Sequence, residues 1–285
     1  MPDHGRQITF GYFLTPTAAD APALVRAGIL CDELGFDLIG VQDHPYQRRF
    51  LDAWTLLSVL GARTSTVSLF PDVASLPLRP PAMLAKAAAS LDLLTDGRVE
   101  LGLGAGAFWE AIEAMGGPRR APGEAVTALS EAIDVMRMMW SGERSARYKG
   151  AAYSLSGVHP GPAPAHPIGV WIGGYKPRML RMVGEKADGW LPSLGYIDAA
   201  GIAEASARID DAAAAAGRTP TDIRRVLNIN GKADRDELVD LCTSLAVQHG
   251  IDTFVLDADP TEASLRPLAE EIMPQVRQAV ARERG

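Results

Sequence analysis

Two residues suited to proton transfer stand together near the start of the chain. Asp43 and His44 follow the short apolar segment Leu38–Gln42 and precede Pro45. An imidazole exchanges a proton near neutral pH, so His44 can act as a proton donor or acceptor. Asp43 can orient that ring or a water molecule. The same arrangement also arises where a histidine caps a loop or packs beneath a proline, and position alone leaves both interpretations open.

A glycine-rich stretch, Arg98–Gly106, ends another apolar segment. Apolar residues alternate at 99, 101 and 103, and glycines stand at 102, 104 and 106, a pattern typical of a buried strand that ends in bare backbone. A ligand or its phosphate can approach such backbone closely. This pattern occurs in Rossmann-type domains, where it suggests an S-adenosylmethionine-dependent methyltransferase. It also occurs in β/α barrels with a flat cofactor across the strand ends, and the glycines alone do not decide between the two.

A third motif has the chemistry of a phosphate site. Gly173 and Gly174 leave backbone N–H groups accessible at the start of a predicted helix, and Lys176 and Arg178 add two positive charges. A solvated basic helix end would contain the same residues. Two further cationic pairs, which favour an anionic ligand or, equally, ordinary surface charge, are Arg48–Arg49 and Arg119–Arg120.

The elements that must position these residues form a regular series. Eight predicted strands alternate with helices: Ile8–Leu14, Leu38–Gln42, Val67–Val73, Arg98–Gly106, Ile168–Ile172, Gly189–Leu194, Arg225–Asn230 and Thr253–Asp257. Eight strand-then-helix units in 285 residues predict an α/β fold, a single (β/α)8 TIM barrel. A small hairpin insertion, about 143–167, is expected between the fourth helix and the fifth strand. No change in composition divides the chain, so we predict one domain, 1–285.

In such a barrel the active site lies at the carboxyl ends of the strands. That rule gathers around one mouth Thr15, Asp43, His44, Asp72, Val73, Ser75, Ala105, Gly106, Trp109, Gly173, Gly174, Ser193, Asn230 and Asp257. The stretch Asp72–Ser75 is long for a strand end and indicates a bulge that pushes backbone into the mouth, although an extended loop is the alternative. The glycine motif follows the fourth strand here. In a methyltransferase it follows the first, which weakens that interpretation.

The bulk properties exclude several classes of function. A chain that is 47% hydrophobic can bury a large core, and a formal net charge of −7 argues against a nucleic-acid partner. Cys31 and Cys242 are far apart and are expected to be reduced core residues. We find neither a signal peptide nor an apolar run of membrane length, so we expect a cytoplasmic protein with no membrane partner. The spacing of His and Cys suits no metal site, and no serine stands in a Gly-x-Ser-x-Gly nucleophile turn.

Taken together, these motifs resemble the bacterial luciferase-like monooxygenase family, and more closely its branch that uses the deazaflavin coenzyme F-420. The resemblance covers nearly the whole chain. It rests on the order and spacing of five segments: Val41–Pro45, Leu78–Ala82, Asp96–Gly106, Trp171–Gly174 and Ala187–Trp190.

The resemblance implies a cofactor ring across the strand ends, with coenzyme F-420 as first choice and FMN as the alternative. It implies that Asp43 and His44 lie beside the ring, and that Asp72–Val73 form a supporting bulge, which contains a cis non-proline peptide in several members. The cofactor-binding candidates are Asp43, Asp72, Val73, Ser75, Ala105, Gly106, Gly173, Gly174, Lys176, Arg178 and Met179. Sugar-phosphate dehydrogenases of this branch carry a carboxylate just after the fourth-strand glycines. This chain has Ala107 there, and its nearest acid is Glu110.

We therefore predict an oxidoreductase that transfers a hydride between a bound deazaflavin or flavin and a small organic substrate, and we expect a homodimer. The catalytic candidates are His44, which would donate or accept a proton, and Trp109, which with Phe108 would form an apolar wall that excludes water. Three alternatives remain: an FMN-dependent monooxygenase that uses molecular oxygen, the methyltransferase, and a barrel that binds a flavin without catalysis.

Overall fold

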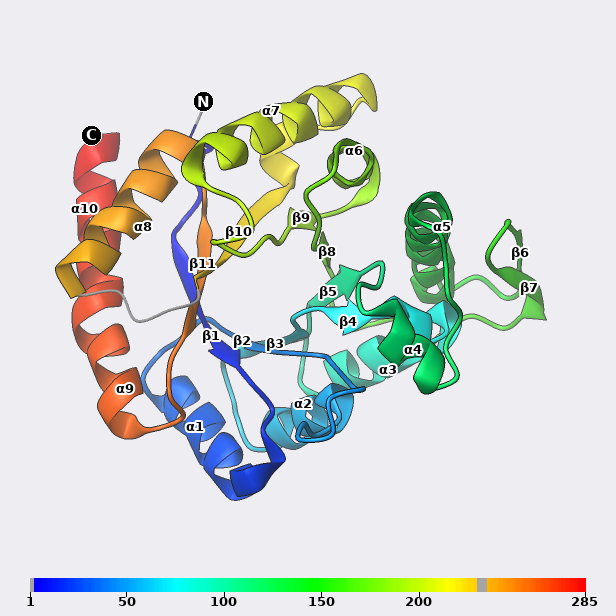
Figure 1. Cartoon of the computed structure of the whole chain (residues 1–285), viewed down its shortest axis with the longest axis horizontal. Helices are drawn as coiled ribbons and strands as arrows, with labels where there is room; N and C mark the ends of the chain where they lie inside the picture. Colours follow the sequence, from blue (N-terminus) through cyan, green and yellow to red (C-terminus); the bar gives the residue numbers. More distant parts are fainter. Residues whose placement is uncertain (1–2, 230–234) are drawn as a thin grey trace.

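Parallel strands surround a central axis in the computed structural model (Figure 1), which describes residues 3–229 and 235–285. The sheet contains β1 (Thr9–Leu14), β2 (Leu38–Val41), β3 (Ser68–Pro71), β4 (Ala74–Ser75), β5 (Leu101–Gly104), β8 (Val170–Ile172), β9 (Gly189–Trp190), β10 (Arg224–Ile229) and β11 (Thr253–Asp257). Their order is β3-β2-β1-β11-β10-β9-β8-β5-β4, and a parallel bridge joins Leu69 of β3 to Val99, just before β5. Because β3 and β4 share the third strand position, the barrel has eight positions, and the predicted fold class is confirmed.

Helices follow the strands and cover the outside of the barrel (Figure 1). They are α1 (Ala21–Glu33), α2 (Ala53–Gly61), α3 (Pro81–Leu94), α4 (Trp109–Ala114), α5 (Pro122–Trp140), α6 (Pro177–Lys186), α7 (Ala199–Ala215), α8 (Arg235–His249), α9 (Glu262–Pro267) and α10 (Met273–Arg284). Short 3-10 turns span Ala18–Asp20, Leu76–Leu78 and Pro220–Asp222. Among the described residues, no helix combines the length and the apolar character needed to cross a bilayer.

Two apolar layers hold this arrangement together. The larger one lies between the strands and the helices, where the apolar faces of the helices pack on the sheet. The smaller one fills the barrel interior with Phe13, Leu38, Phe70, Trp171, Leu191, Val226 and Val255. The rings of Phe70 and Trp171 lie 5.1 Å apart at its centre. The barrel is therefore packed below its mouth, and a ligand must bind above this layer.

The predicted insertion is an antiparallel hairpin, β6 (Ala146–Lys149) and β7 (Ser154–Val158), which stands beyond α5 in Figure 1. The Glu131 carboxylate on α5 accepts three backbone N–H bonds from the hairpin turn, of 2.7, 2.9 and 3.0 Å. Gly150 is needed beside this contact, because a Cβ there would lie 2.2 Å from Glu131 Oε2. One buried carboxylate thus anchors the hairpin turn to the barrel.

Two strand predictions are longer than the strands of the structure: the fourth strand spans Leu101–Gly104 rather than Arg98–Gly106, and the sixth is also shorter. The regular part of the sixth strand ends at Trp190 rather than at Leu194, because Pro192 has no N–H to donate, and only a single parallel bridge between Ser193 and Asn228 continues the pairing with β10. The final helix has a π-helical segment, Leu268–Ile272, directly after Pro267, where the proline lacks the donor that a regular helix requires.

Candidate functional site

The sequence-predicted site residues lie at the carboxyl ends of four neighbouring barrel strands. Asp43 and His44 follow β2, Asp72 and Val73 separate β3 from β4, and Ser75 ends β4. The remaining candidates follow the next two strands: Ala105, Gly106 and Trp109 after β5, and Gly173, Gly174, Lys176, Arg178 and Met179 after β8. Thr15 and Ser193 follow β1 and β9, and Asp257 ends β11, whereas Asn230 lies outside the described residues.

The bulge in the third strand is formed by Asp72 and Val73, whose peptide bond is cis. The Val73 side chain occupies the space above the β5 glycines. A Cβ added at Gly104 would lie 2.8 Å from Val73 Cγ2, and one at Gly102 would lie 3.2 Å from Val73 Cγ1 and 2.2 Å from the Pro71 carbonyl oxygen. The expectation that a ligand approaches Gly102 and Gly104 is therefore wrong, because the chain itself fills that space.

Glycine is required at position 106 by the backbone conformation as well as by the available space. Its φ is +103°, a conformation that residues with a side chain rarely adopt, and Pro77 and Trp109 bound the position of a Cβ there. Trp109 begins α4 and packs over this turn.

Asp43 is a buried carboxylate that joins two strand ends. Its Oδ2 accepts the Ser75 backbone N–H at 3.0 Å and lies 3.4 Å from Arg79 Nε. Arg79 also binds the carboxylate of Asp52, the N-cap of α2. Burial raises the pKa of Asp43, and the positive charge of Arg79 opposes that rise. Asp43 Oδ1 is buried without a hydrogen-bond partner in the described structure.

Asp72 is a second buried carboxylate, and it reaches across the mouth. Asn228 on β10 donates its Nδ2–H to Asp72 Oδ1 at 3.0 Å and lies 3.3 Å from Ser193 Oγ. Burial raises the pKa of Asp72 to about 7, and the hydrogen bond from Asn228 opposes this only in part. Asp72 Oδ2 and Asn228 Oδ1 are both buried and lack a partner among the described residues.

His44 lies in an aromatic cluster beside these acids. Its Nδ1 is 2.5 Å from the hydroxyl of Tyr46, and its ring meets the Phe108 ring edge-on with centroids 5.6 Å apart. Burial lowers the pKa of His44, and nearby Asp43 opposes that effect. This shift favours the neutral form of the imidazole. The contact with Tyr46 leaves Nε2 as the ring nitrogen available for proton exchange.

The glycines after β8 lead into α6. Trp190 Nε1–H donates to the Gly174 carbonyl oxygen at 2.9 Å, and the buried side chain of Met179 packs against the bare face of Gly174. Lys176 is the N-cap of α6 and Arg178 is in its first turn, and both side chains are exposed. These two cations stand at the positive end of a ten-residue helix, where an anion is stabilised.

The sequence profile of the luciferase-like monooxygenase family matches residues 8–240. The chain belongs to this family. An F-420-dependent glucose-6-phosphate dehydrogenase from Microbacterium testaceum is 30% identical over 229 residues, which are 78% of this chain and 67% of that enzyme.

Two solved structures share the fold of this luciferase-like chain. An F-420-dependent secondary alcohol dehydrogenase in complex with an F-420–acetone adduct has a TM-score of 0.79 at 18% identity, and the match covers 96% of this chain and 99% of that one. A type II Baeyer–Villiger monooxygenase, the oxygenating constituent of 3,6-diketocamphane monooxygenase from Pseudomonas putida in complex with FMN, has a TM-score of 0.76 at 17% identity, covering 94% and 98%. At these identities the likeness concerns the barrel alone.

The sequence pair Arg119–Arg120 does not act as one unit, because the two side chains have different partners. Arg119 binds Glu110 at 2.8 Å and Glu113 at 2.7 Å, both on α4, so its charge is balanced. Arg120 lies over the Tyr153 ring, 5.4 Å from its centroid. Arg119 is therefore paired, whereas Arg120 Nη1 is buried without a hydrogen-bond partner in the described structure, and Arg48 and Arg49 are exposed.

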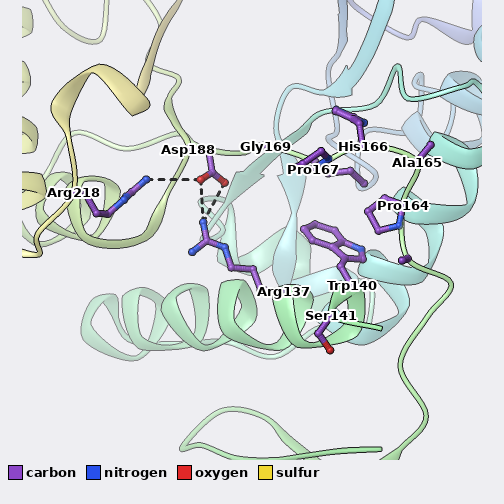
Figure 2. A pocket seen from close by; sticks show the side chains of 12 residues that line it. Arg137, Trp140, Ser141, Pro164, Ala165, His166, Pro167, Gly169, Asp188 and Arg218 are labelled. Carbon is purple, nitrogen blue, oxygen red and sulfur yellow. Dashed lines mark hydrogen bonds and ion pairs between the residues drawn. The ribbon is translucent and has the colours of Figure 1, made fainter. Parts of the chain in front are cut away.

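A cavity of about 800 Å³ lies at the opposite end of this barrel (Figure 2). Gly169 and Asp188 in its wall directly precede β8 and β9, so the cavity opens at the amino ends of the strands. Figure 2 shows Arg137 and Arg218 pointing toward Asp188, whose carboxylate they contact at 3.0 and 3.7 Å. These charges are paired with one another, as expected where a barrel end serves stability. Across residues 3–229 and 235–285, no group of three or more His, Cys, Asp or Glu side chains could hold a metal ion.

Sequence reasoning missed three residues of this luciferase-like site. Tyr46 and Arg79 contact His44 and Asp43 through side chains that strand patterns do not predict. Asn228 had a usable signal. It stands two residues after Val226, which faces the barrel interior, so the alternation of a strand turns Asn228 to the same side.

Proposed function

We propose that this chain is an oxidoreductase that transfers a hydride between a bound deazaflavin or flavin and a small organic substrate, with coenzyme F-420 as its first-choice cofactor. The observation that carries the proposal is the convergence, at one barrel mouth, of a half-buried histidine, a bulge and an exposed cationic helix start. The F-420-dependent dehydrogenase relative and the F-420-bound alcohol dehydrogenase with the same fold support this choice.

The residues at the mouth fit a flavin or deazaflavin. Asp43 Oδ1 is a buried acceptor without a partner among the described residues, and a ring system with N–H groups or a polyhydroxyl chain supplies a donor. In the proposal, Val73, Ser75, Ala105 and Gly106 complete the ring site. Gly173, Gly174, Lys176, Arg178 and the Met179 backbone hold the phosphate. When bound, the ring supplies hydride acceptor or donor chemistry.

His44 is the proposed proton-exchanging residue. Nδ1 is occupied by the Tyr46 hydroxyl, so we assign proton transfer to Nε2. Phe108, which is in contact with the His44 ring, and Trp109 over the Gly106 turn form the proposed apolar wall. This wall keeps water from the proton that is being moved.

A second candidate function is an FMN-dependent monooxygenase that uses molecular oxygen. It is favoured by the shared fold with an FMN-bound Baeyer–Villiger monooxygenase. The barrel topology disfavours the methyltransferase, because the glycine motif follows the fourth strand position.

The proposed substrate is not a sugar phosphate. Ala107 has no carboxylate, and the nearest acid, Glu110, is occupied by Arg119 and largely exposed to solvent. An uncharged small molecule suits the aromatic cluster of His44, Tyr46 and Phe108 better.

The proposal includes a homodimer of one-domain chains, 1–285, in the cytoplasm. Val59 on α2 and Leu94 at the end of α3 are 42% and 82% exposed, beside a cavity of about 510 Å³ between these helices. An apolar face of this kind is buried when a second copy covers it. Cys31 and Cys242 are free, buried thiols, as in a reducing compartment. Sedimentation of Leu94→Glu, expected to be monomeric, tests the dimer.

The decisive experiment is a titration of the purified protein with coenzyme F-420, FMN and S-adenosylmethionine in turn. We expect binding of one of the first two and none of the third. Micromolar binding of S-adenosylmethionine without flavin or deazaflavin binding would refute the proposal.

His44→Ala then tests the reaction. Loss of a general acid or base lowers kcat by roughly 10²–10⁴-fold, and cofactor affinity and Tm should barely change. If His44 only shapes its loop, the variant will melt several degrees lower and turn over normally.

A further inference from the structure

Asp72 and Asn228 meet across the full width of the barrel. In the sheet order β3-β2-β1-β11-β10, their strands are four steps apart, which is half of the eight positions. Their side chains nevertheless share a 3.0 Å hydrogen bond, because both point to the barrel axis above the apolar interior layer. The pair therefore forms the floor of the mouth.

The surroundings of this pair are neutral. Asn228 on β10 and Ser193 after β9 contribute an amide and a hydroxyl. On the β2 side, Asp72 Oδ2 would lie 3.0 Å from a Cβ at Gly40, so bare glycine makes room for it. The nearest phenol, Tyr175 after β8, accepts the Ser193 backbone N–H. Within the described structure, none of these elements places a cation beside Asp72. The ionised form of a buried carboxyl group without a cationic partner is costly in free energy.

Each of the two side chains carries one unpartnered atom. Asp72 Oδ2 and Asn228 Oδ1 are buried oxygen atoms without a hydrogen-bond donor. A proton on the Asp72 carboxyl would convert one of these two acceptors into a hydrogen-bond donor. Burial likewise raises the pKa of Asp72 to about 7, in the direction that keeps this proton.

We propose that Asp72 and Asn228 form a proton-holding acid–amide pair at the floor of the mouth, and that its neutral state is the one that accepts an anionic flavin or deazaflavin. This inference rests on the proposed function for its ligand, but the protonation of Asp72 does not. A ring that accepts a hydride gains negative charge. A neutral floor tolerates that charge, and an ionised Asp72 repels it. Asp72 is thus a positioning residue that makes ligand affinity depend on pH.

The first test uses the protein without ligand and the isosteric variant Asp72→Asn. Its amide places a donor and an acceptor where the protonated acid has them. A folded-state pKa above the unfolded value means that wild-type stability falls as pH rises from about 4 to about 7. We expect the variant to melt only slightly higher than wild type at pH 5, where a minor part of that loss has occurred. At pH 8 the variant should melt higher, by about 4–8 °C.

Glu110→Gln is the matched control, because it also removes one carboxylate near the mouth, and that carboxylate is exposed. Its Tm difference from wild type should not increase between pH 5 and pH 8.

Infrared spectra of the wild type at pH 6 and pH 8.5 provide a second readout that does not require the variant to fold. The carbonyl band of a protonated carboxyl should be present at pH 6 and lost at pH 8.5.

The second test measures binding of dithionite-reduced FMN and of coenzyme F-420 at pH 6 and pH 8.5. Between pH 6 and pH 8.5 we expect wild-type affinity to fall roughly tenfold more than that of Asp72→Asn, because only the wild type gains a negative charge at residue 72. Ligand phosphate and His44 are present in both proteins, so their effects cancel in this comparison. A constant Tm difference together with no protonated-carboxyl band would overturn the acid–amide pair. Equal pH dependence of binding in the two proteins would reject its role toward the ligand. If neither cofactor binds at any pH, the proposed function fails, and the melting and infrared results still decide whether Asp72 holds its proton.

Discussion

The fit between Val73 and the β5 glycines gives the sharpest prediction about the mouth. Gly104→Ala places a methyl group 2.8 Å from Val73 Cγ2, and the next nearest atom is 3.7 Å away. The overlap is therefore with a single methyl group. Overpacking of this size costs about 1–3 kcal/mol.

Removal of the opposing side chain should relieve that cost. Val73→Ala alone loses two partly buried methyl groups, which costs about 1–2 kcal/mol. In the double variant the added methyl enters the space that Val73 has left. We expect Gly104→Ala/Val73→Ala to be more stable than the sum of the single effects by about 1 kcal/mol or more. The assay is urea unfolding of the four proteins in a double-mutant cycle.

Gly102→Ala is the matched control on the same strand. Its Cβ would lie 2.2 Å from the Pro71 carbonyl oxygen, a backbone atom that Val73→Ala does not move. Val73→Ala should therefore rescue Gly104→Ala but leave most of the cost of Gly102→Ala, because the 3.2 Å contact of that Cβ with Val73 Cγ1 is much less severe than its 2.2 Å overlap with the Pro71 oxygen. Strict additivity for the Gly104 pair would refute the reasoning, because it would mean that the two side chains do not compete for one space.

Three other predictions concern charge and hydrogen bonding at the mouth. The double variant Lys176→Ala/Arg178→Ala should lower cofactor affinity about tenfold, since two exposed charges are lost, and unchanged affinity would leave them as a solvated helix end. Tyr46→Phe should lower kcat about tenfold with little change in Tm, because its histidine partner loses the contact at Nδ1, and a full-speed variant would assign Tyr46 a packing role only. Arg79→Met should destabilise the fold by about 3 kcal/mol at pH 8 in urea unfolding, because Asp43 loses its buried counter-charge. That loss should shrink at pH 5, where protonation of Asp43 removes the unpaired charge, and an equal loss at both pH values would contradict the argument.

Strand positions could be predicted from the sequence because each strand is an apolar run that stops in a turn residue. The run that ends in the β5 glycines and the run before Asp43 are examples, and the barrel rule then places their ends together. The partner of Asp72 could not be predicted in this way. Asn228 belongs to a strand half a barrel away, and only the radius of the closed sheet makes the two side chains meet.

The glycines at 102 and 104 show why a local pattern misled. A glycine at a strand end is bare whether a ligand or a neighbouring side chain takes the space, and sequence alone does not distinguish these cases. Val73 could be named as part of a bulge, but its direction over β5 depends on the path of the third strand. Likewise, the pairing of Arg119 with α4 depends on how a short helix sits after its turn.

The division of the third strand position into β3 and β4 has a consequence for how the barrel opens. β3 pairs with β2, β4 pairs only with β5, and a single bridge at Leu69 joins β3 to the β5 segment. The β4 backbone is therefore held by one short ladder to β5 and by the Ser75 N–H bond to the Asp43 carboxylate, whereas β1 lies between two full neighbours. Hydrogen exchange should therefore be faster at the third strand position than in the neighbouring strands of the barrel. We expect the loops after β2 and β5, on either side of the β3–β4 position, to separate transiently while the opposite half of the barrel stays closed.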